Sequence, residues 1–483
     1  MQILYVAAEI YPLVKTGGLG DVTAALPPAL ISQGVDVRVM LPGIPAIMQG
    51  IIDLKPIAVI DNKFGTKEIR LLLGKMPDTD VPAYVIDAPE LFARPGNPYI
   101  GPDGKDWHDN HLRFALLSWM AAHMALSGFD KEWIPQVIHG HDWHTGLMPA
   151  YVAASAAENK PATILTIHNL AYQGLFPYSL FDSLALPHSF FSVDGLEFYG
   201  QVSFMKAGLI FADSVTTVSP TYAKEILSKE FGCGLEGVLS SRANTVTGIL
   251  NGVDYSIWDA ATDTALPKKY STRSLKGKAA CKKALQAEFG LEESSDRLLL
   301  GVVSRLAYQK GLDLVLGALP EIISAGAQII MLGSGDHEME KQFLDIAKSY
   351  SRSVAVHIGY SESFSHRIIA GSDVILVPSR FEPCGLTQLY GLRYGTLPLV
   401  RRVGGLADSV VDVTNESKEK VKATGFVFQE ASQQALLQTI HRANELYKDK
   451  DAWTKVMKNA MKQNFSWEKS AQDYMKLYQG LLS

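Results

Sequence analysis

Short runs of β-branched and aliphatic residues alternate along the chain with longer segments whose apolar residues recur at helical spacing. Continuous apolar strands separated by helices are typical of parallel sheets that helices cover on both faces. Eleven such strands suit two doubly wound sheets better than one oversized sheet. We expect the strands at residues 3–8, 35–41, 83–86, 136–139, 162–167 and 214–218, and again at 298–303, 328–332, 354–358, 374–377 and 397–400.

The two halves of the chain open with the same strand–loop–helix plan, although no sequence repeat links them. A stretch rich in turn-forming residues, 245–262, separates the halves and is the expected boundary. The sequence therefore predicts an α/β protein of two Rossmann-like domains, 1–245 and 246–460, followed by a terminal segment, 461–483, that carries a helix from about Trp467 to Leu482.

Composition narrows the class of protein. The 483 residues are 47% hydrophobic and 20% charged, as in ordinary globular enzymes, and the net charge of −5 argues against a nucleic-acid partner. The three cysteines, Cys233, Cys281 and Cys384, lie far apart, which indicates free thiols in a reducing compartment. No run approaches about 18 apolar residues, and the N-terminus lacks a basic leader. We therefore expect a cytoplasmic protein without a membrane partner.

The first candidate loop is Lys15-Thr16-Gly17-Gly18-Leu19-Gly20-Asp21, directly after the first expected strand. Consecutive glycines let the backbone approach a ligand closely, and the following helix offers N–H groups to an anion. Lys15 adds a full positive charge. The segment is neither a Walker loop nor a GxGxxG fingerprint, so a plain glycine turn with a solvated lysine stays open beside phosphate binding.

The second candidate is the cluster His139-Gly140-His141-Asp142-Trp143-His144. Imidazoles and carboxylates are good zinc or iron ligands. At a strand end, however, alternate residues point to opposite faces, so His139 and His141 share a face while Asp142 turns away. An aromatic ring beside a carboxylate suits a sugar better, because rings stack on pyranose C–H faces and carboxylates bind hydroxyls. A sugar site is therefore favoured over a metal site.

The third candidate, His168-Asn169, follows the expected strand at 162–167. A histidine in this place either makes structural hydrogen bonds or faces a reacting sugar. The sequence alone does not decide between these roles.

The fourth candidate loop, 304–311, carries Arg305 and Lys310 between a strand and a helix start. Two cations five residues apart can converge on one diphosphate, with arginine as a planar fork and lysine as a point charge. Ser334, at the end of another strand, suits the approach of a nucleotide. Surface salt bridges are the alternative role for these cations.

The fifth candidate, 380–390, is the most specific. Glu382 precedes a proline, and the residues Cys384-Gly385-Leu386-Thr387 then open a helix. Backbone N–H groups at a helix start bind phosphate, while Glu382 is expected to face the ligand. A second glycine turn, Gly404-Gly405, follows a little downstream. A lone glutamate before proline carries little information, but four other loops of the right kind accompany this one.

The chain resembles the bacterial glycogen synthase and plant starch synthase family in seven segments, which run from residue 15 to about 410 in that family's order and spacing. They read KTGGLGDV, HDWHTGL, HNLAYQG, LNGVD, SRLAYQKG, FEPCGLTQLYGLRYG and VGGLADSV. The resemblance implies a GT-B type fold, in which two Rossmann-like domains face each other across a cleft, with a C-terminal helix that packs back on the first domain.

The resemblance also implies an activity and a set of roles. The expected reaction moves glucose from ADP-glucose to the non-reducing end of glycogen or another α-1,4-glucan, with retention, release of ADP and no metal or other cofactor. The implied catalytic residues are Glu382, His168, Arg305, Lys310 and Asp142. The implied substrate-binding residues are Lys15, Gly17, Gly18, Tyr99, Asn251, Ser334, Cys384, Gly385, Leu386 and Thr387.

One position separates this family from its relatives. Many retaining transferases of the same fold carry a second glutamate eight residues after the first, whereas this chain has Tyr390 after Glu382. That difference matches the synthase pattern. Without a second carboxylate to act as a nucleophile, we expect same-face attack by the acceptor hydroxyl, with the departing phosphate taking its proton.

Three other classes of protein predict different features. A nicotinamide dehydrogenase would carry GxGxxG and an acidic residue about 20 positions later, which neither half supplies cleanly. A metal-dependent hydrolase would use the HGHDWH cluster and would be sensitive to chelators. A non-catalytic glucan-binding protein would need aromatic platforms but not Arg305, Lys310 and Glu382 together.

Overall fold

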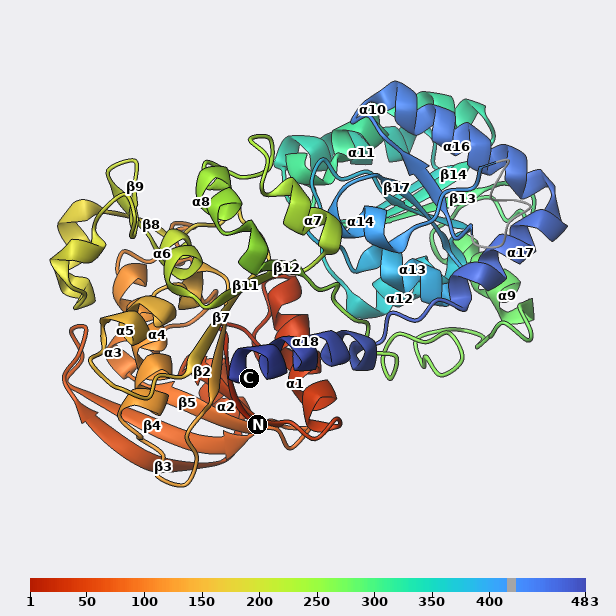
Figure 1. The fold of residues 1–483 in the computed structure, drawn as a ribbon. Helices are drawn as coiled ribbons and strands as arrows, with labels where there is room; N and C mark the ends of the chain where they lie inside the picture. Colours follow the sequence, from red (N-terminus) through yellow and green to blue (C-terminus); the bar gives the residue numbers. More distant parts are fainter. Residues whose placement is uncertain (415–422) are drawn as a thin grey trace. The chain divides into compact units, whose positions relative to one another are not determined.

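The computed structural model describes residues 1–414 and 423–483. They form two compact units (Figure 1): unit 1 comprises Met1–Gly252 with Trp467–Ser483, and unit 2 comprises Val253–Ser466. The division at 252 lies beyond the expected boundary at 245 because the strand Val246–Gly248 completes the sheet of unit 1. Likewise the helix Lys450–Met461 and the residues up to Ser466 belong to unit 2.

Unit 1 is built on a nine-stranded sheet with the order β12-β11-β7-β6-β1-β2-β5-β4-β3. The strands from β12 to β5 in this order run parallel, as the apolar runs predicted, but β4 pairs antiparallel with both β5 and β3. The expectation of purely parallel sheets is therefore wrong at this edge. The strands are β1 (Gln2–Val6), β2 (Asp36–Pro42), β3 (Ile52–Asp61), β4 (Glu68–Lys75), β5 (Pro82–Asp87), β6 (Val137–His141), β7 (Ala162–Ile167), β11 (Ser214–Thr217) and β12 (Val246–Gly248).

Helices cover this sheet, and a small antiparallel sheet of order β8-β10-β9 is added to it. The small strands are β8 (Leu175–Pro177), β9 (Glu197–Phe198) and β10 (Gln201–Ser203). The helices are α1 (Gly18–Ile31), α2 (Pro45–Gly50), α3 (Pro89–Phe92), α4 (Asn110–Leu126), α5 (Met148–Ala154), α6 (Phe204–Phe211), α7 (Pro220–Glu225), α8 (Glu236–Ser241) and α18 (Trp467–Leu482), with short 3₁₀ turns at Trp143–Thr145, Tyr178–Leu184, His188–Phe190 and Ala243–Thr245.

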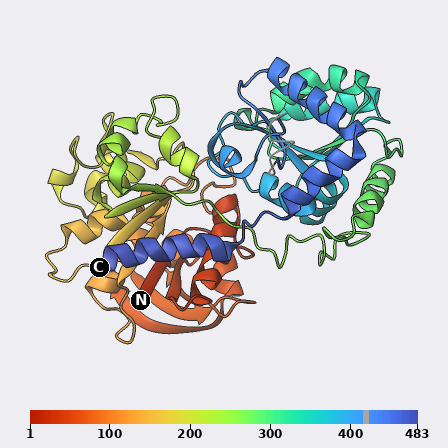
Figure 2. The same ribbon diagram turned by 45° about the vertical axis from the view of Figure 1, so that its right-hand side comes forward.

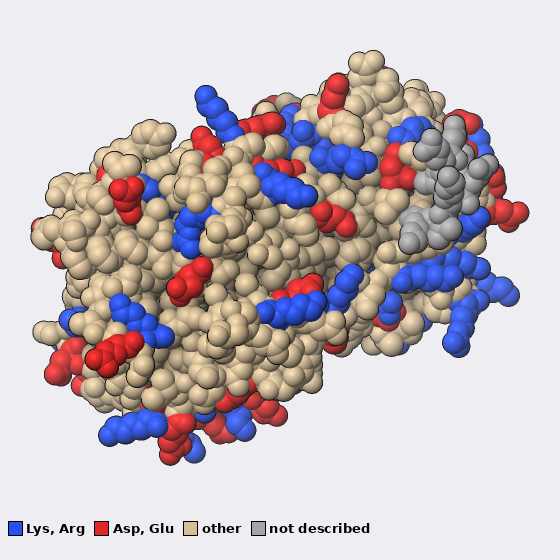
Figure 3. All heavy atoms as spheres, viewed as in Figure 1, with Lys and Arg blue, Asp and Glu red and all other residues tan. Residues whose placement is uncertain are grey.

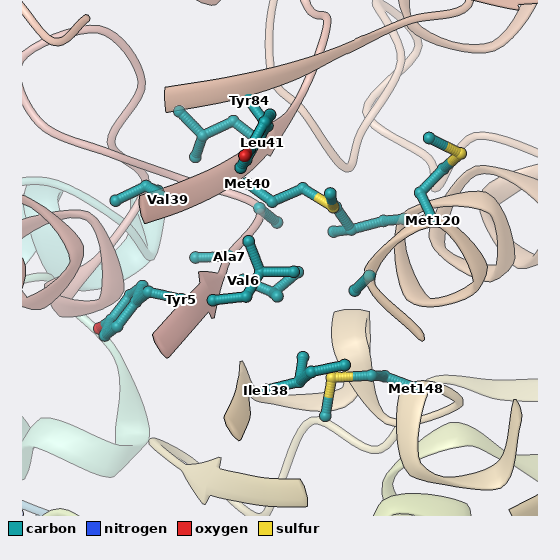
Figure 4. Close-up of a cluster of buried hydrophobic side chains, with 14 of the residues drawn as sticks. Tyr5, Val6, Ala7, Val39, Met40, Leu41, Tyr84, Met120, Ile138 and Met148 are labelled. Carbon is teal, nitrogen blue, oxygen red and sulfur yellow. The ribbon is translucent and has the colours of Figure 1, made fainter. Parts of the chain in front are cut away.

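The core of unit 1 lies between the central strands and their covering helices. Figure 4 shows the methionines Met40, Met120 and Met148 among the strand residues Val6 and Ile138, all of them fully buried. Because both faces of β1 and β6 are covered, their sequences are continuous apolar runs rather than alternating ones. This packing fixes the strand ends from which the candidate loops start.

The C-terminal helix α18 packs on unit 1, against residues that lie more than 200 positions earlier in the chain. It runs beside α1 in two views of the molecule (Figures 1 and 2). Its buried residues recur at helical spacing and form one apolar face: Trp467, Ala471, Tyr474 and Tyr478. Hydrogen bonds from Gln33 to the Glu468 carbonyl and from Ser470 to the Leu250 carbonyl, of 2.8 and 2.7 Å, fix its position.

The described residues of unit 2 form a six-stranded parallel sheet of order β15-β14-β13-β16-β17-β18. The strands are β13 (Leu299–Val303), β14 (Gln328–Gly333), β15 (Val354–Ile358), β16 (Val374–Val377), β17 (Leu397–Arg401) and β18 (Phe426–Phe428). The helices are α9 (Lys276–Glu288), α10 (Leu312–Ser324), α11 (His337–Ser349), α12 (Glu362–Gly371), α13 (Thr387–Tyr394), α14 (Gly404–Ser409), α16 (Gln433–Lys448) and α17 (Lys450–Met461), with a 3₁₀ turn at Tyr308–Lys310.

Among the parallel strands of each sheet, the strand order reverses at one point. In unit 1 the chain proceeds from β1 to β2 on one side and places β6 on the other, and in unit 2 it proceeds from β13 to β14 and places β16 on the other side. Doubly wound sheets bind ligands beyond the carboxyl ends of the strands at such a point. The candidate loops after β1 and β6 in unit 1 and after β13 and β16 in unit 2 lie at these two points, and the loop after β7 lies one strand away, beside β6.

Acidic side chains lie among the basic ones over the face drawn in Figure 3. Within residues 1–414 and 423–483, no helix has the length and apolar character needed to cross a bilayer.

Candidate active site

The glycine loop of unit 1 leaves a helix start open to a ligand. Helix α1 begins at Gly18, and its N-cap residue Gly17 supplies no side-chain hydrogen bond to the first-turn N–H groups. A Cβ atom added at Gly17 would meet no atom within 4 Å. Lys15 stands beside this helix start and pairs with Asp21 of its first turn, at 2.8 Å. The loop thus offers accessible backbone N–H groups and the charged Lys15 side chain, which together suit the binding of an anion.

Glu9 is a further candidate site residue, which sequence reasoning missed. Its buried carboxylate follows β1 and accepts hydrogen bonds from the backbone N–H and the hydroxyl of Thr16, both at 2.6 Å. It also accepts from the Tyr99 hydroxyl at 2.5 Å, and the Tyr99 ring stacks on His144 with centroids 4.6 Å apart. Glu9 therefore ties the glycine loop to Tyr99. A charged residue directly after an apolar strand was the available signal.

Asp142 follows β6 and holds the next loop of the site. Its Oδ1 atom accepts hydrogen bonds from the backbone N–H groups of His168 and Asn169, at 2.7 and 3.3 Å. Burial raises the pKa of Asp142 to about 7, against the lowering effect of these two bonds and with a further rise from the charge of Glu9. A carboxyl of this pKa exchanges its proton near neutral pH.

The strand-end histidines His139 and His141 lie on one face, as their alternation predicted, with ring centroids 4.2 Å apart. His139 is held at both nitrogens, by the Tyr478 hydroxyl of α18 at 2.8 Å and by the Thr166 hydroxyl at 2.6 Å. Burial lowers its pKa to about 3. Within the described ranges no group of three or more His, Cys, Asp and Glu side chains is placed to hold a metal ion.

His168 follows β7 and contacts His141 and Asp142, which lie at the end of β6. Its Nε2 atom lies 2.9 Å from Nδ1 of His141, and its backbone N–H binds Asp142. Burial lowers the pKa of His168 to about 3, so the ring is neutral at physiological pH. The structure thus brings Asp142 and His168 into direct contact, two residues that were expected to act together.

Asn251 lies beyond β12, near the end of unit 1. Its side chain is buried, and its Oδ1 atom has no hydrogen-bond partner among the described residues. Buried polar atoms usually have a partner. The unpartnered amide oxygen is therefore a candidate acceptor for a ligand hydroxyl.

Glu382 and Lys310 form the centre of the candidate site in unit 2. The Glu382 side chain is 8% exposed, and its Oε2 atom accepts from Lys310 Nζ at 2.6 Å and from the Ser379 hydroxyl at 2.8 Å. The ion pair joins the loops after β13 and β16, the two neighbouring strands at which the order reverses. Ser379 is a second residue that the sequence did not reveal, because a serine after an apolar strand is common.

Arg305 lies on the loop after β13 and Ser334 on the loop after β14, and both residues are exposed. Among the described residues no ion pair engages the Arg305 guanidinium, unlike the Lys310 ammonium. The Leu306 N–H binds the Ser334 carbonyl at 2.9 Å, so the loops after β13 and β14 are linked beside Arg305. Arg305 therefore presents an accessible cation next to the Lys310–Glu382 pair in sequence.

The segment from Cys384 to Thr387 forms a turn that leads into α13. Gly385 has a φ of +72°, which favours glycine, and the Gln388 amide donates to the carbonyls of Cys384 and Gly385 at 3.0 and 2.8 Å. Helix α13 begins at Thr387 without a side-chain cap. Its first N–H groups are therefore available to a phosphate, while Cys384 is buried.

The second glycine turn supports the Glu382 loop from behind. A Cβ atom at Gly404, whose φ is +41°, would stand 2.0 Å from the Glu382 carbonyl oxygen. The N–H of Gly405 binds the same carbonyl at 3.2 Å. The segment Gly404-Gly405 therefore positions Glu382 through close backbone contact rather than through a side chain.

Tyr390, which stands where related transferases carry a second glutamate, is engaged in aromatic packing. Its ring stacks on Trp258 with centroids 3.8 Å apart, and Trp258 stacks on His366 at the same distance. The side chain of residue 390 is thus part of the packing of unit 2.

Comparison with known proteins agrees with these features along the whole chain. The family model for the starch synthase catalytic domain matches residues 2–241, and the model for glycosyl transferases group 1 matches residues 286–463. Glycogen synthases of Francisella tularensis subsp. holarctica and subsp. novicida are each 56% identical to this chain over 486 aligned residues, which cover 100% of this chain and 99% of each relative.

Solved structures support the same assignment. The catalytic domain of starch synthase IV from Arabidopsis thaliana, bound to ADP and acarbose, is 33% identical, with a TM-score of 0.89 and 99% of both chains covered. Sucrose-phosphate synthase from Thermosynechococcus elongatus, 17% identical with a TM-score of 0.61, shares the fold. This chain is therefore a glycosyltransferase with the two-domain GT-B type of fold, and it belongs to the glycogen synthase and starch synthase family.

Proposed function

We propose that this chain transfers glucose from ADP-glucose to the non-reducing end of an α-1,4-glucan such as glycogen, with retention of configuration and release of ADP. The single observation that carries the proposal is the partly buried Glu382–Lys310 pair at the strand reversal of unit 2. Full-length similarity to glycogen synthases and to a starch synthase solved with ADP supports it.

The cations of unit 2 are proposed to stabilise the leaving group. As the bond from glucose to phosphate breaks, negative charge develops on ADP. The exposed Arg305, Lys310 and the uncapped start of α13 at Thr387 are suited to accept that charge, because charged donors and helix N-termini stabilise developing anions. Ser334 is proposed to contact the nucleotide from the loop after β14.

Glu382 is proposed to orient the glucose and to stabilise the positive charge at its anomeric carbon. Retaining glycosidases use two carboxyl groups about 5–5.5 Å apart, one of which attacks the sugar. Here the second position is Tyr390, whose ring is stacked on Trp258. We therefore favour attack by the acceptor hydroxyl on the face that the phosphate leaves, with a phosphate oxygen accepting the hydroxyl proton.

Unit 1 is proposed to supply neutral hydrogen-bonding groups to the sugars. His168 and Asp142 would lie near the anomeric centre, and Tyr99 and the Asn251 amide oxygen, which has no partner among the described residues, would contact sugar hydroxyls. The glycine loop with Lys15, Gly17 and Gly18 would contact the donor. Cys384, Gly385 and Leu386 would line the donor on unit 2 through their backbone.

No metal or other cofactor is assigned a role in this proposal, since Arg305 and Lys310 can neutralise the diphosphate themselves. We also propose that the protein acts in the cytoplasm. None of its three cysteines, all of them within the described residues, forms a disulfide bond, which suits a reducing compartment.

The test is transfer of labelled glucose to glycogen. We expect label from ADP-glucose to enter the polymer, label from UDP-glucose to enter far more slowly, and EDTA to leave the rate unchanged. Digestion of the product with an exo-acting, α-1,4-specific amylase should release the label early, because new residues lie at non-reducing ends. Absence of transfer from either donor would refute the proposed function, and loss of activity with EDTA would refute the metal-independent mechanism.

A further inference from the structure

His168, the candidate catalytic histidine, is held at two points by residues at the end of β6. Asp142 accepts the backbone N–H of His168, and Nδ1 of His141 lies 2.9 Å from Nε2 of His168. Nδ1 of His168 makes no hydrogen bond among the described residues, and this side chain is only partly buried. It is therefore the nitrogen that is left to face a ligand.

A hydrogen bond between two neutral imidazole nitrogens needs one N–H and one lone pair, so the pair has two possible arrangements. If His168 donated from Nε2, then His141 would carry its own proton on Nε2. That Nε2 atom is buried and has no hydrogen-bond partner in the described part of the chain. A buried N–H group without an acceptor is rare and unfavourable in proteins.

In the other arrangement, Nε2 of His141, the atom without a partner among the described residues, carries a lone pair and no proton. His141 then donates from Nδ1, His168 accepts at Nε2, and the His168 proton resides on Nδ1. Under-satisfied acceptors are tolerated more often than orphaned donors. Burial lowers the pKa values of both rings, and each neighbouring histidine lowers that of His141 further, so neither ring carries a second proton.

The His141 ring is also fixed in orientation. It stacks on the ring of Tyr5 with centroids 4.0 Å apart, and its centroid lies 4.2 Å from that of the His139 ring. His139 in turn is held at both nitrogens by Tyr478 and Thr166. The direction of Nδ1 of His141 is thus set by packing of β1, β6 and the C-terminal helix.

We propose that His141 is a positioning residue that holds His168 in its Nδ1–H tautomer, so that His168 meets the sugar as a hydrogen-bond donor and not as a base. This inference rests on the proposed function for the identity of the ligand. The proton of the acceptor hydroxyl then has to leave by the phosphate oxygen, because a ring with a proton on Nδ1 and a bonded Nε2 has no free lone pair.

The tautomer is measurable without any turnover. Long-range proton–nitrogen spectra of the full chain labelled with ¹⁵N-histidine distinguish protonated from unprotonated ring nitrogens, and His168→Gln identifies the His168 signals by their loss. We expect Nδ1 of His168 to be protonated and Nε2 to be unprotonated. The reverse pattern would overturn the proposal, even if the protein transfers glucose as proposed.

Two substitutions of His141 separate positioning from packing. His141→Asn keeps an N–H donor near the Nδ1 position, whereas His141→Leu fills space without a donor. We expect His141→Leu to lower kcat about 10- to 100-fold, as loss of a group that orients a metal-ligating histidine does, with little change in KM for ADP-glucose. His141→Asn should recover most of kcat and keep the His168 tautomer.

The matched control is His123→Leu, which removes a partly buried histidine of unit 1 whose ring binds the Trp119 carbonyl of its own helix. This variant should keep wild-type kcat. Equal losses in His141→Asn and His141→Leu would show that His141 serves packing alone and would overturn the proposal. If wild-type protein transfers no glucose from ADP-glucose, the proposed function fails, while the spectra still decide the tautomer.

Discussion

The two units differ in the groups that they place at corresponding points of their sheets: neutral hydrogen-bonding groups in unit 1 and charged groups in unit 2. At the strand reversal of unit 1, Asp142 has a pKa near 7, and the neighbouring His168, after β7, is a neutral ring. At the strand reversal of unit 2, Glu382 is paired with Lys310 and Arg305 stands exposed. The same doubly wound architecture thus supports neutral hydrogen bonding in one unit and charge neutralisation in the other. This difference matches the two needs of the proposed reaction, a sugar and a diphosphate.

The largest effect is expected from Glu382→Ala. Removing the carboxylate takes away the group proposed to stabilise the anomeric carbon, and transfer should fall about 10³-fold or more, at the upper end of what one electrostatic group contributes. ADP affinity, measured by calorimetry, should be preserved, because Lys310 and Arg305 remain. Ser379→Ala, which removes only one hydrogen bond to Glu382, should cost about tenfold or less. Near-normal turnover of Glu382→Ala would contradict its assignment.

Arg305 tests the charged character of unit 2 without disturbing a buried pair. Arg305→Ala should lower kcat about 10²–10³-fold, while Arg305→Lys should recover part of the loss because the charge stays but the planar fork is lost. The control is Arg352→Ala, an exposed arginine just before the start of β15, at the other end of the sheet from the candidate loops. The measurement is the steady-state rate of glucose transfer. Equal rates for Arg305→Ala and the control would refute a role of Arg305 in leaving-group stabilisation.

The pH dependence of the free energy of unfolding tests whether the Asp142 carboxyl of unit 1 is held near neutrality. Its pKa is about 7 in the folded protein and near its ordinary value of 3.8 in the unfolded chain. The folded state therefore holds more protons between these values, and the carboxyl makes the protein less stable as pH rises from 4 to 7. Above pH 7 the penalty is complete, up to a few kcal/mol.

Asp142→Asn keeps a side-chain oxygen as acceptor but cannot ionise. We expect urea unfolding to show this variant more stable than wild type at pH 8, with the advantage shrinking as the pH is lowered towards 4. A difference that stays constant across this range would show that Asp142 is not held near neutrality by burial.

The smallest effects come from a pair of glycines in the two units. Gly404→Ala has to fit a Cβ atom 2.0 Å from the Glu382 carbonyl oxygen at a positive φ, which should cost about 1–3 kcal/mol of unfolding free energy and lower activity. Gly17→Ala faces open space, so stability should change by about 1 kcal/mol or less, while KM for ADP-glucose rises several-fold. Unfolding curves and KM values together check both, and an unchanged KM in Gly17→Ala would remove the glycine loop from the donor site.

Much of the fold was predictable because individual strands have a recognisable local pattern of apolar residues. The expected strands at 162–167, 354–358 and 374–377 coincide with β7, β15 and β16, since residues buried on both faces form uninterrupted apolar runs. The hairpin of β3 and β4 was missed because β3 contains Pro56 and leaves many residues exposed, so its pattern is not that of a central strand.

The sequence by itself determined the class of fold and the loops that carry polar and glycine residues, because strand ends and turns depend on neighbouring residues. Only the tertiary structure decided which of these residues touch. Lys310 and Glu382 lie 72 positions apart, and His141 and His168 lie 27 apart. Their contacts exist because β13 pairs with β16 and β6 pairs with β7. Strand order is a property of the assembled sheet, and no local pattern in the chain contains it.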